Sequence, residues 1–395
     1  NTYTGDTYIN GSTINVDDLS RLGANGASTI YLNGGTLNLA ASGTITTGRS
    51  LGMGGGAVQI ADGLTLQLAN NSLVGGTGGY ITFISPNTLP SSVDGNGTID
   101  LGSSQTGLTA DDTLILRSVV AKFADPAALG DATLFLQHNG NFVFNNDITT
   151  LKPAGSMTID NPIIFNNSRF DYFYVDAGAG NTVTFSGEFR RLARYLTTVG
   201  GVASYGGTKL VLEGTSQNGY SVFAVNGDID VKKEAPWDGV LDNRFPYGTL
   251  GGARFQSDAE TAPSTIRFFS PANGGYSEYT FSAISNEADG FNGTANGSVP
   301  LTISVDGGAN VNVTANNTGG QLLQAVDEIN KVGQGSVTLY ISGNIASNQV
   351  ATRANGAPLN IREGSWIVKS VANSAGAFWN PTSGSVVVSD IDSGL

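Results

Sequence analysis

The sequence lacks cysteine altogether and has one histidine, His138, and two methionines among its 395 residues. The absence of cysteine excludes disulfides, zinc–thiolate sites, thiol nucleophiles and iron–sulfur clusters together. Stability must therefore come from buried apolar side chains and backbone hydrogen bonds. His138 stands in "LQHNGN" without a serine to serve, so we interpret it as a solvated residue beside a turn.

Charge is scarce and unequal in sign. Charged residues make up 13% of the chain, with 19 Lys and Arg against 32 Asp and Glu, a net charge of −13. Nucleic-acid binding needs a basic footprint, so we expect no nucleic-acid partner. The densest basic cluster, Arg190, Arg191 and Arg194 in "FRRLAR", is more typical of a solvated face than of a docking site.

Long apolar runs are also missing. No stretch approaches the roughly 18 to 20 consecutive apolar residues that span a bilayer as a helix. We therefore expect no membrane span. The sequence opens inside a strand pattern without an initiating methionine or a leader, which indicates a processed protein or part of a longer one.

What is abundant is apolar alternation with a period of two. In "GAVQIADGLTLQLAN" (56–70), Val58, Ile60, Leu64, Leu66 and Leu68 can face one side. Such alternation, broken by Gly, Asn and Asp, is the signature of strands and turns. Similar runs recur at 13–16, 28–32, 36–40, 133–137, 141–145, 182–187, 209–214, 228–231, 301–305 and 336–343. The sequence predicts an all-β protein, either an antiparallel sandwich or a parallel solenoid.

Internal repetition favours the solenoid. A glycine-punctuated strand, a variable arm and a second strand recur at 206–232 and again over 331–344 with 357–370. A third copy is split between the two ends of the chain: 382–395 provides its first half and the opening residues 1–18 its second. The two ends together would complete one repeat.

These residues resemble the autotransporter-associated β-strand repeat family of bacterial surface proteins. "VGQGSVTLYISGN" (332–344) is similar to the first part of its pattern, and "NTYTGDTYINGSTINV" (1–16) with "SRLG" (20–23) to the rest. The connecting stretch 47–79 also resembles that family. The resemblance implies an elongated, right-handed parallel β-solenoid (β-helix) with a few short helices and long loops, located outside the cell or on a bacterial cell surface.

We expect a single solenoid over 1–395. Its sections would be a first repeat block (1–120), a second (121–239), a loop-rich or inserted section (240–320) and a C-terminal block (321–395). The stretch 234–248, rich in aromatic residues and proline, looks like a long loop that leaves the solenoid. Leu322, Leu323, Val326 and Ile329 in 320–333, and the apolar residues of 188–200, lie at helical spacing and predict two amphipathic helices. We expect no capping helix near either terminus.

The ends of a solenoid expose unpaired backbone groups, which must be capped or will pair with another molecule. The sequence therefore predicts a head-to-tail filament in which the last strand of one copy meets the first strands of the next. The predicted interface residues are Asn1, Tyr3, Ile9, Ile14, Val16, Val386, Val387, Val388 and Ile391. One alternative is a segment of a longer adhesin passenger that binds surface glycans, and another is a carbohydrate-active enzyme.

Candidate chemistry is sparse. "DGNGTID" (94–100) resembles part of an EF-hand loop, but the first and last ligand positions would fall on Ser92 and Ser103, so a turn is the better interpretation. Paired carboxylates such as a hydrolase needs are offered by Asp111 with Asp112, Asp171 with Asp176, and Asp228 with Asp230. Surface aspartates at corners are the commoner explanation of such pairs. We predict no catalytic residue, no metal site and no cofactor.

Overall fold

The computed structural model describes residues 3–23, 28–76, 78–86, 96–137, 149–165, 172–191, 201–204, 208–212, 216–217, 222–225, 229–231, 253–257, 264–270, 277–285, 301–315, 323–324, 329–342, 359–371 and 386–388. The chain divides into two compact units, Asn1–Ala177 and Gly178–Leu395. The boundary falls inside the expected repeat block 121–239. The predicted loop 234–248 lies outside the described residues.

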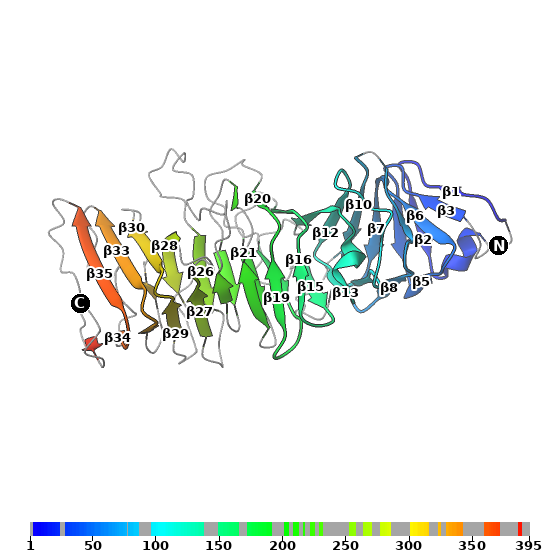
Figure 1. Ribbon diagram of the computed structural model, residues 1–395. Helices are drawn as coiled ribbons and strands as arrows, with labels where there is room; N and C mark the ends of the chain where they lie inside the picture. The colour runs from blue at the N-terminus through cyan, green and yellow to red at the C-terminus, as the bar shows by residue number, and fades with distance from the viewer. Residues whose placement is uncertain are drawn as a thin grey trace. The chain divides into compact units, whose positions relative to one another are not determined.

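The first unit is built from parallel ladders of strands (Figure 1). The first ladder has the order β1-β3-β6-β9, the second β2-β4-β7-β10-β12-β14-β17, and the third β5-β8-β11-β13-β15-β18. Because consecutive strands of the chain enter different ladders, each coil of the chain adds one strand to each of two or three sheets.

The strands of the first ladder are β1 (Thr7–Tyr8), β3 (Ser28–Tyr31), β6 (Arg49–Gly52) and β9 (Leu73–Val74); those of the second are β2 (Thr13–Val16), β4 (Thr36–Leu39), β7 (Gly54–Ile60), β10 (Tyr80–Ile84), β12 (Thr113–Arg117), β14 (Thr133–Gln137) and β17 (Ile163–Phe165). The third ladder comprises β5 (Gly43–Ile45), β8 (Thr65–Leu68), β11 (Thr98–Asp100), β13 (Val120–Phe123), β15 (Thr149–Pro153) and β18 (Tyr172–Val175), and β16 (Met157–Ile159) follows β15 in the chain.

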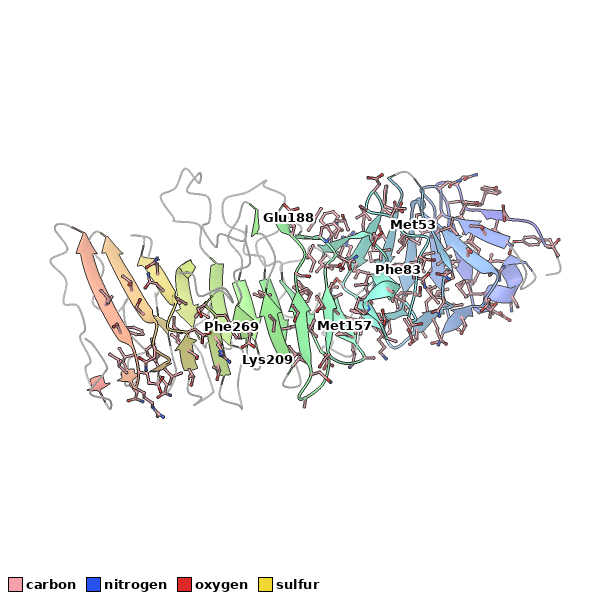
Figure 2. All side chains as sticks on the ribbon, in the orientation of Figure 1. Met53, Phe83, Met157, Glu188, Lys209 and Phe269 are labelled. Carbon is pink, nitrogen blue, oxygen red and sulfur yellow. The ribbon has the colours of Figure 1, made fainter. Side chains whose placement is uncertain are left out.

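The core of this unit is made of inward side chains that stack from coil to coil. In the second ladder Leu37 pairs with Val58, Val58 with Phe83 and Phe83 with Leu116. All four are fully buried, and Phe83 is labelled in Figure 2. Alternate residues of a strand point to opposite faces, so the period-two pattern of the sequence places one apolar residue per coil in each of these rows.

The second unit has two long parallel ladders, ordered β19-β22-β25-β27-β29-β32-β34-β36 and β24-β26-β28-β30-β33-β35. The first contains β19 (Thr182–Phe185), β22 (Lys209–Leu212), β25 (Ile229–Val231), β27 (Ser264–Phe268), β29 (Leu301–Val305), β32 (Ile329–Val332), β34 (Leu359–Ile361) and β36 (Val386–Val388). The second contains β24 (Val222–Val225), β26 (Ala253–Ser257), β28 (Ser277–Ser285), β30 (Ala309–Ala315), β33 (Ser336–Ser342) and β35 (Ser365–Val371). Shorter strands are β20 (Phe189–Arg191), β21 (Gly201–Ser204), β23 (Ser216–Gln217) and β31 (Leu323–Gln324).

Every strand pair for which the described residues define a register is parallel, as in β10 with β12 and β27 with β29. The one antiparallel contact among the described residues is an isolated bridge between Asn10 and Gly34. The chain is therefore an all-β parallel solenoid, and the prediction from the repeats is confirmed against the antiparallel sandwich. Within the section 240–320, the described strands β26 to β30 continue the ladders of the second unit.

The predictions of two amphipathic helices are wrong at the residues that the structure describes. In 320–333, Leu323–Gln324 form β31 and Ile329–Val332 form β32. Leu323 and Ile329 thus belong to different strands in different ladders, and their helical spacing in the sequence is a coincidence. In 188–200, Phe189–Arg191 form the strand β20.

Helical structure in the described residues is limited to two 3-10 turns, η1 (Leu19–Leu22) and η2 (Pro126–Leu129). Both begin after an aspartate, Asp18 or Asp125, whose side chain accepts a hydrogen bond from a backbone N–H of the turn. η1 is a single 3-10 turn near the start of the chain, not the amphipathic capping helix that the prediction concerned. Among these described residues no helix has the length and apolarity needed to cross a membrane.

Candidate functional site

The predicted interface residues at the start of the chain belong to one coil, the first coil, which we define as residues 7–23 with β1, β2 and η1, and to the segment just before it. Tyr3 is 37% exposed and Ile14 is half-buried, whereas Ile9 and Val16 are buried in the core of their own unit. Only Tyr3 and Ile14 therefore offer appreciable side-chain surface to a second molecule.

The predicted residues at the other end lie in the second unit. Val386–Val388 form β36, which pairs in parallel with Leu359–Ile361 of β34. Asn1 and Ile391 lie outside the described residues. In the order of the ladder β36 is the last strand, and β35 is the last of the neighbouring ladder.

The outer side of β1 and β2, which we call the β1–β2 edge, has no strand beside it among the described residues. On the inner side, Thr36 N–H donates to Ser12 C=O and Ala40 N–H to Val16 C=O. Because backbone groups alternate sides along a strand, those of Thr13 and Asn15 must face outward. Likewise Ile9 N–H donates to the carbonyl oxygen of Tyr31 in β3 and Gly11 N–H to that of Asn33, which leaves the backbone groups of Tyr8 facing outward.

The first coil has the composition of an interior coil. "TYINGSTINV" (7–16) matches "IYLNGGTLNL" (30–39), with Tyr, Asn, Gly, Thr and Asn at the same places. The equivalent residues differ in burial: Ile14 is half-buried where Leu37 is fully buried, and Tyr8 is 57% exposed where Tyr31 is half-buried. Natural edge strands are usually protected by charge or proline, and residues 7–16 contain neither.

Two amide ladders run up to this edge with one polarity. Asn38 Nδ2 donates to Asn15 Oδ1 at 2.7 Å, and Asn33 Nδ2 donates to Asn10 Oδ1 at 3.0 Å. In each pair the later residue donates to the earlier one, so the amide NH2 groups of Asn10 and Asn15 are left at the edge. Beside them, the rings of Tyr8 and Tyr31 stack with centroids 4.9 Å apart and an interplanar angle of 11°.

The third side of the first coil is closed by η1. In chain order η1 follows β1 and β2 as β5 follows β3 and β4, so it takes the place of a strand. The side chain of Leu19 lies 2.8 Å from where a Cβ atom on Gly43 of β5 would stand. The guanidinium of Arg49, 1% exposed, donates to the carbonyl oxygens of Leu19 at 2.8 Å, Gly23 at 3.2 Å, and Leu22. Burial lowers the pKa of Arg49 from its ordinary value.

The candidate carboxylate pairs do not form catalytic dyads in the described residues. Asp111 is exposed, but the neighbouring Asp112 is fully buried, and its carboxylate accepts from the N–H groups of Gly76, Gly79 and Thr109 and from the Thr109 hydroxyl. Such a fully bonded carboxylate ties the backbone at Gly76 and Gly79 to the backbone at Thr109. Asp112 therefore has a structural role in the fold.

The other pairs are each half described. Asp176 forms an ion pair with Lys152 at 2.9 Å, and Asp230 forms one with Lys209; Asp171 and Asp228 lie outside the described residues.

The other candidate residues are placed only in part. His138 and Arg194 lie outside the described residues, and of Arg190 and Arg191 only the backbone, in β20, is described. Ile99 is buried in β11, so the EF-hand-like stretch continues as a core strand. The part of the chain with described side chains holds no cluster of metal-ligating residues.

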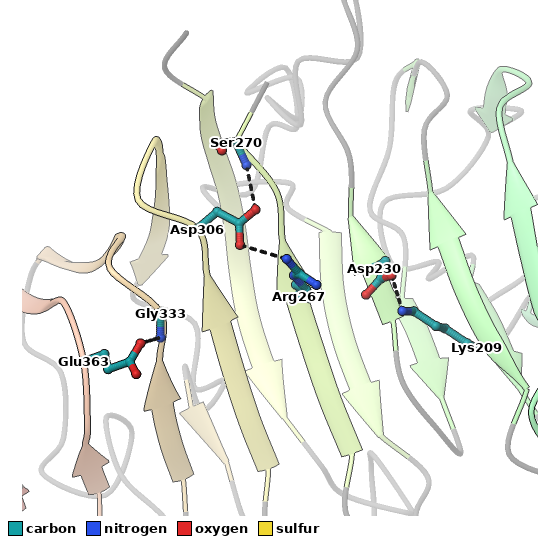
Figure 3. A network of polar contacts seen from close by, with 7 residues as sticks. All are labelled: Lys209, Asp230, Arg267, Ser270, Asp306, Gly333 and Glu363. Carbon is teal, nitrogen blue, oxygen red and sulfur yellow. Dashed lines mark hydrogen bonds and ion pairs between the residues drawn. The ribbon is translucent and has the colours of Figure 1, made fainter. Parts of the chain in front are cut away.

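Polar contacts link successive coils of the second unit (Figure 3). Asp306 accepts from the Arg267 guanidinium at 3.4 Å and from Ser270 N–H at 3.3 Å, and Lys209 pairs with Asp230. The Arg267 guanidinium also lies over the ring of Phe269, 4.4 Å from its centroid. The Asp306 contacts and the Lys209–Asp230 pair join residues of neighbouring strands or their connections, which points to a role in holding coil to coil.

Lys331 is a buried cation that sequence reasoning missed. It is fully buried in the inward row between Ile303 and Ile361, where apolar residues are expected. Its ammonium donates to the carbonyl oxygens of Val332 at 3.0 Å, Gly333 at 2.5 Å and Glu363 at 2.9 Å. Burial lowers the pKa of Lys331 to about 8, and the Glu363 carboxylate opposes that shift.

Comparison with known proteins gave no match: no family model, no curated protein and no solved structure resembles the chain at a significant level.

Proposed function

We propose that the chain is a structural β-solenoid protein, the subunit of a head-to-tail filament outside the cell or on a bacterial cell surface. The observation that carries the proposal is the first coil, whose residues 7–16 repeat those of an interior coil while its outer edge has no neighbouring strand among the described residues. An edge of this kind, without charge or proline, favours the addition of another strand.

The parallel arrangement makes such growth directional. In a parallel ladder the two outer edges are different, and the outer edge of β2 is complementary to the outer edge of β36 or β35, the last strands of their ladders among the described residues. A contact between unlike surfaces is heterologous, and its open repetition from copy to copy gives a filament. The resemblance of residues 1–23 and 332–344 to autotransporter-associated repeats supports a location of the protein outside the cell.

A non-enzymatic role is supported by the candidate carboxylates. Asp112 is enclosed by hydrogen bonds, and Asp176 and Asp230 are engaged with lysines. A general acid or base must instead reach a substrate from a cleft. These groups serve the fold.

A second candidate is an adhesin segment of a longer passenger that binds surface glycans. The exposed rings of Tyr8 and Tyr80, 57% and 45% exposed, favour it, because a tyrosine combines a flat apolar face with a polar hydroxyl. Binding of the full chain to immobilised oligosaccharides, lost in Tyr8→Ala and Tyr80→Ala, would support this candidate.

Electron microscopy of the purified chain tests the filament proposal. We expect filaments from the full chain and dispersed particles from a version that lacks residues 382–395 and with them β36. A circular dichroism spectrum of the truncated chain checks that it is still folded. Dispersed particles from both proteins over a wide range of concentrations would contradict the proposal and favour the adhesin segment.

A further inference from the structure

The three sides of the first coil differ in what they can accept. β1 and β2 present outward backbone groups from Tyr8, Thr13 and Asn15, with no strand beside them among the described residues. On the third side η1 replaces a strand, and Leu19 covers Gly43 of β5. The coil is therefore open on two sides and closed on one.

The closed side is held firmly. Arg49 satisfies three carbonyl oxygens at the end of η1, those of Leu19, Leu22 and Gly23. Displacing η1 would leave a buried guanidinium without partners, which is among the costlier defects a protein core can carry. An incoming strand that needed the place of η1 would have to overcome this cost, whereas strands added to β1 and β2 would not.

We propose that the joint between two copies of this chain is two-stranded: the second copy adds strands to β1 and β2 and none beside β5, where η1 stays in place. This inference rests on the proposed function and specifies its interface. The occupant is the C-terminal end of a second copy, because residues 382–395 provide the first half of the repeat whose second half is residues 1–18. The last described strands of the second unit, β36 and β35, each end one ladder, so that end offers two strands, one for β1 and one for β2.

The rows define what the incoming coil must supply. The Nδ2 groups of Asn10 and Asn15 require acceptor oxygens, continuing the polarity of the Asn33–Asn10 and Asn38–Asn15 bonds. Ile14 is half-buried and requires an apolar side chain from the incoming coil. Leu37 already has such a neighbour, because Ile14 is its register partner in the preceding coil. The backbone groups of Thr13 and Asn15 require a parallel strand.

A matched pair of proline substitutions tests the two-stranded joint. Thr13→Pro removes an outward N–H from β2 and leaves the bonds to β4 intact, since proline is tolerated at the first residue of an edge strand. Thr44→Pro removes the corresponding N–H from β5, where Ile45 C=O accepts from Ala69 on the β8 side and Thr44 faces the other way. We expect Thr13→Pro to reduce sedimentable polymer at least tenfold and Thr44→Pro to assemble like the unmodified chain.

A second pair covers the case in which a proline disturbs folding, as judged by circular dichroism and thermal melting. Ile14→Lys places a charge on the open edge, and Tyr80→Lys places one at another exposed apolar residue of the same unit, in a strand with neighbours on both sides. We expect the first to block assembly and the second to permit it.

The outcomes separate the two proposals. Filaments from the unmodified chain, from Thr13→Pro and from Ile14→Lys would overturn the two-stranded joint and leave the filament function standing. Loss of assembly in Thr44→Pro would show that β5 also takes a strand, and would likewise overturn the joint. No filaments from the unmodified chain would overturn the proposed function itself, with the β1–β2 edge then covered by a preceding segment of a longer chain.

Discussion

Asn38 donates a hydrogen bond from its side-chain amide to the side-chain oxygen of Asn15, 23 residues earlier in the chain, at 2.7 Å. The two residues are register partners in the parallel ladder of β2 and β4. An amide carries both donors and acceptors, so such a pair always leaves one donor end and one acceptor end unused. In the second unit Asn360 donates to Asn330 at 3.0 Å with the same polarity. In both of these pairs, therefore, the amide of the later coil donates to the amide of the earlier coil.

Arg49→Met should loosen η1. The substitution keeps much of the buried volume but removes the donors to the carbonyl groups of Leu19, Leu22 and Gly23. The expected cost is about 2 kcal/mol, or roughly a 30-fold rise in amide exchange by local opening. Hydrogen exchange over residues 19–23 measures it. The control is Arg21→Ala, which breaks a well-exposed ion pair with Asp17 and should change exchange by less than about threefold.

Asp112→Asn should destabilise the first unit by about 2 to 4 kcal/mol. The carboxylate accepts from Gly76, Gly79 and Thr109, and an asparagine would turn an NH2 group toward some of these donors. The midpoint of urea unfolding reports the loss. Asp111→Asn alters the adjacent exposed carboxyl and should leave the midpoint nearly unchanged. Equal effects of the two substitutions would contradict the structural role assigned to Asp112.

Gly56→Ala should be strongly destabilising: the residue lies in β7 next to the irregularity at Gly55, where the register with β10 shifts. A Cβ atom there would stand 2.3 Å from the Leu32 carbonyl oxygen and 2.4 Å from that of Gly35, and neither backbone group can move without opening the ladder. We expect a loss of about 2 kcal/mol or more, measured as a lower midpoint of urea unfolding. Gly5→Ala, with nothing within 4 Å of the new Cβ, is the control. A tolerated Gly56→Ala would show that β7 does not lie against the preceding coil as described.

Lys331 should make stability depend on pH in alkaline solution. Its pKa is lowered to about 8 in the folded protein from an ordinary value of 10.5, so between these values the unfolded chain binds more protons than the folded one. Stability therefore rises as the pH is raised from about 8 to 10.5, by an amount of the order of 3 kcal/mol, and is independent of this group below that window. Urea unfolding across the window checks the sign.

The pH prediction needs a comparison variant because other groups titrate in the same range. Lys331→Met removes the buried ammonium and should abolish this rise, and Lys122→Met removes an exposed lysine of β13 and should retain it. A rise of the same size in Lys331→Met would assign the effect to other groups.

The parallel solenoid could be predicted from the sequence because its signal is repeated. Runs such as 13–16, 36–40 and 301–305 alternate with period two and recur, and the structure places them in β2, β4 and β29. The helix predicted over 320–333 failed because apolar residues from two short strands can fall at helical spacing by chance. Spacing alone does not show that Leu323 and Ile329 belong to separate strands.

The buried cations could not be predicted for a different reason. Arg49 and Lys331 occupy inward places where an apolar residue is the rule, and what retains them is backbone geometry, three carbonyl groups converging at the end of η1 or at the bend around Gly333 and Glu363. Tyr8 is a further residue that the sequence analysis missed. It was not among the predicted interface residues, although it is the most exposed large apolar side chain of the described residues. Its match to Tyr31 in the aligned coils is the signal that would have identified it.

The central claim, that the β1–β2 edge receives strands from a second copy, is tested most directly by amide exchange in the assembled and dispersed states. The N–H groups of Thr13 and Asn15 face outward and should exchange rapidly in dilute protein. At concentrations that give filaments we expect them to be protected at least tenfold, because a parallel strand would then accept their hydrogen bonds. Filaments in which the peptide covering residues 7–16 exchanges as fast as in dilute protein would contradict the account.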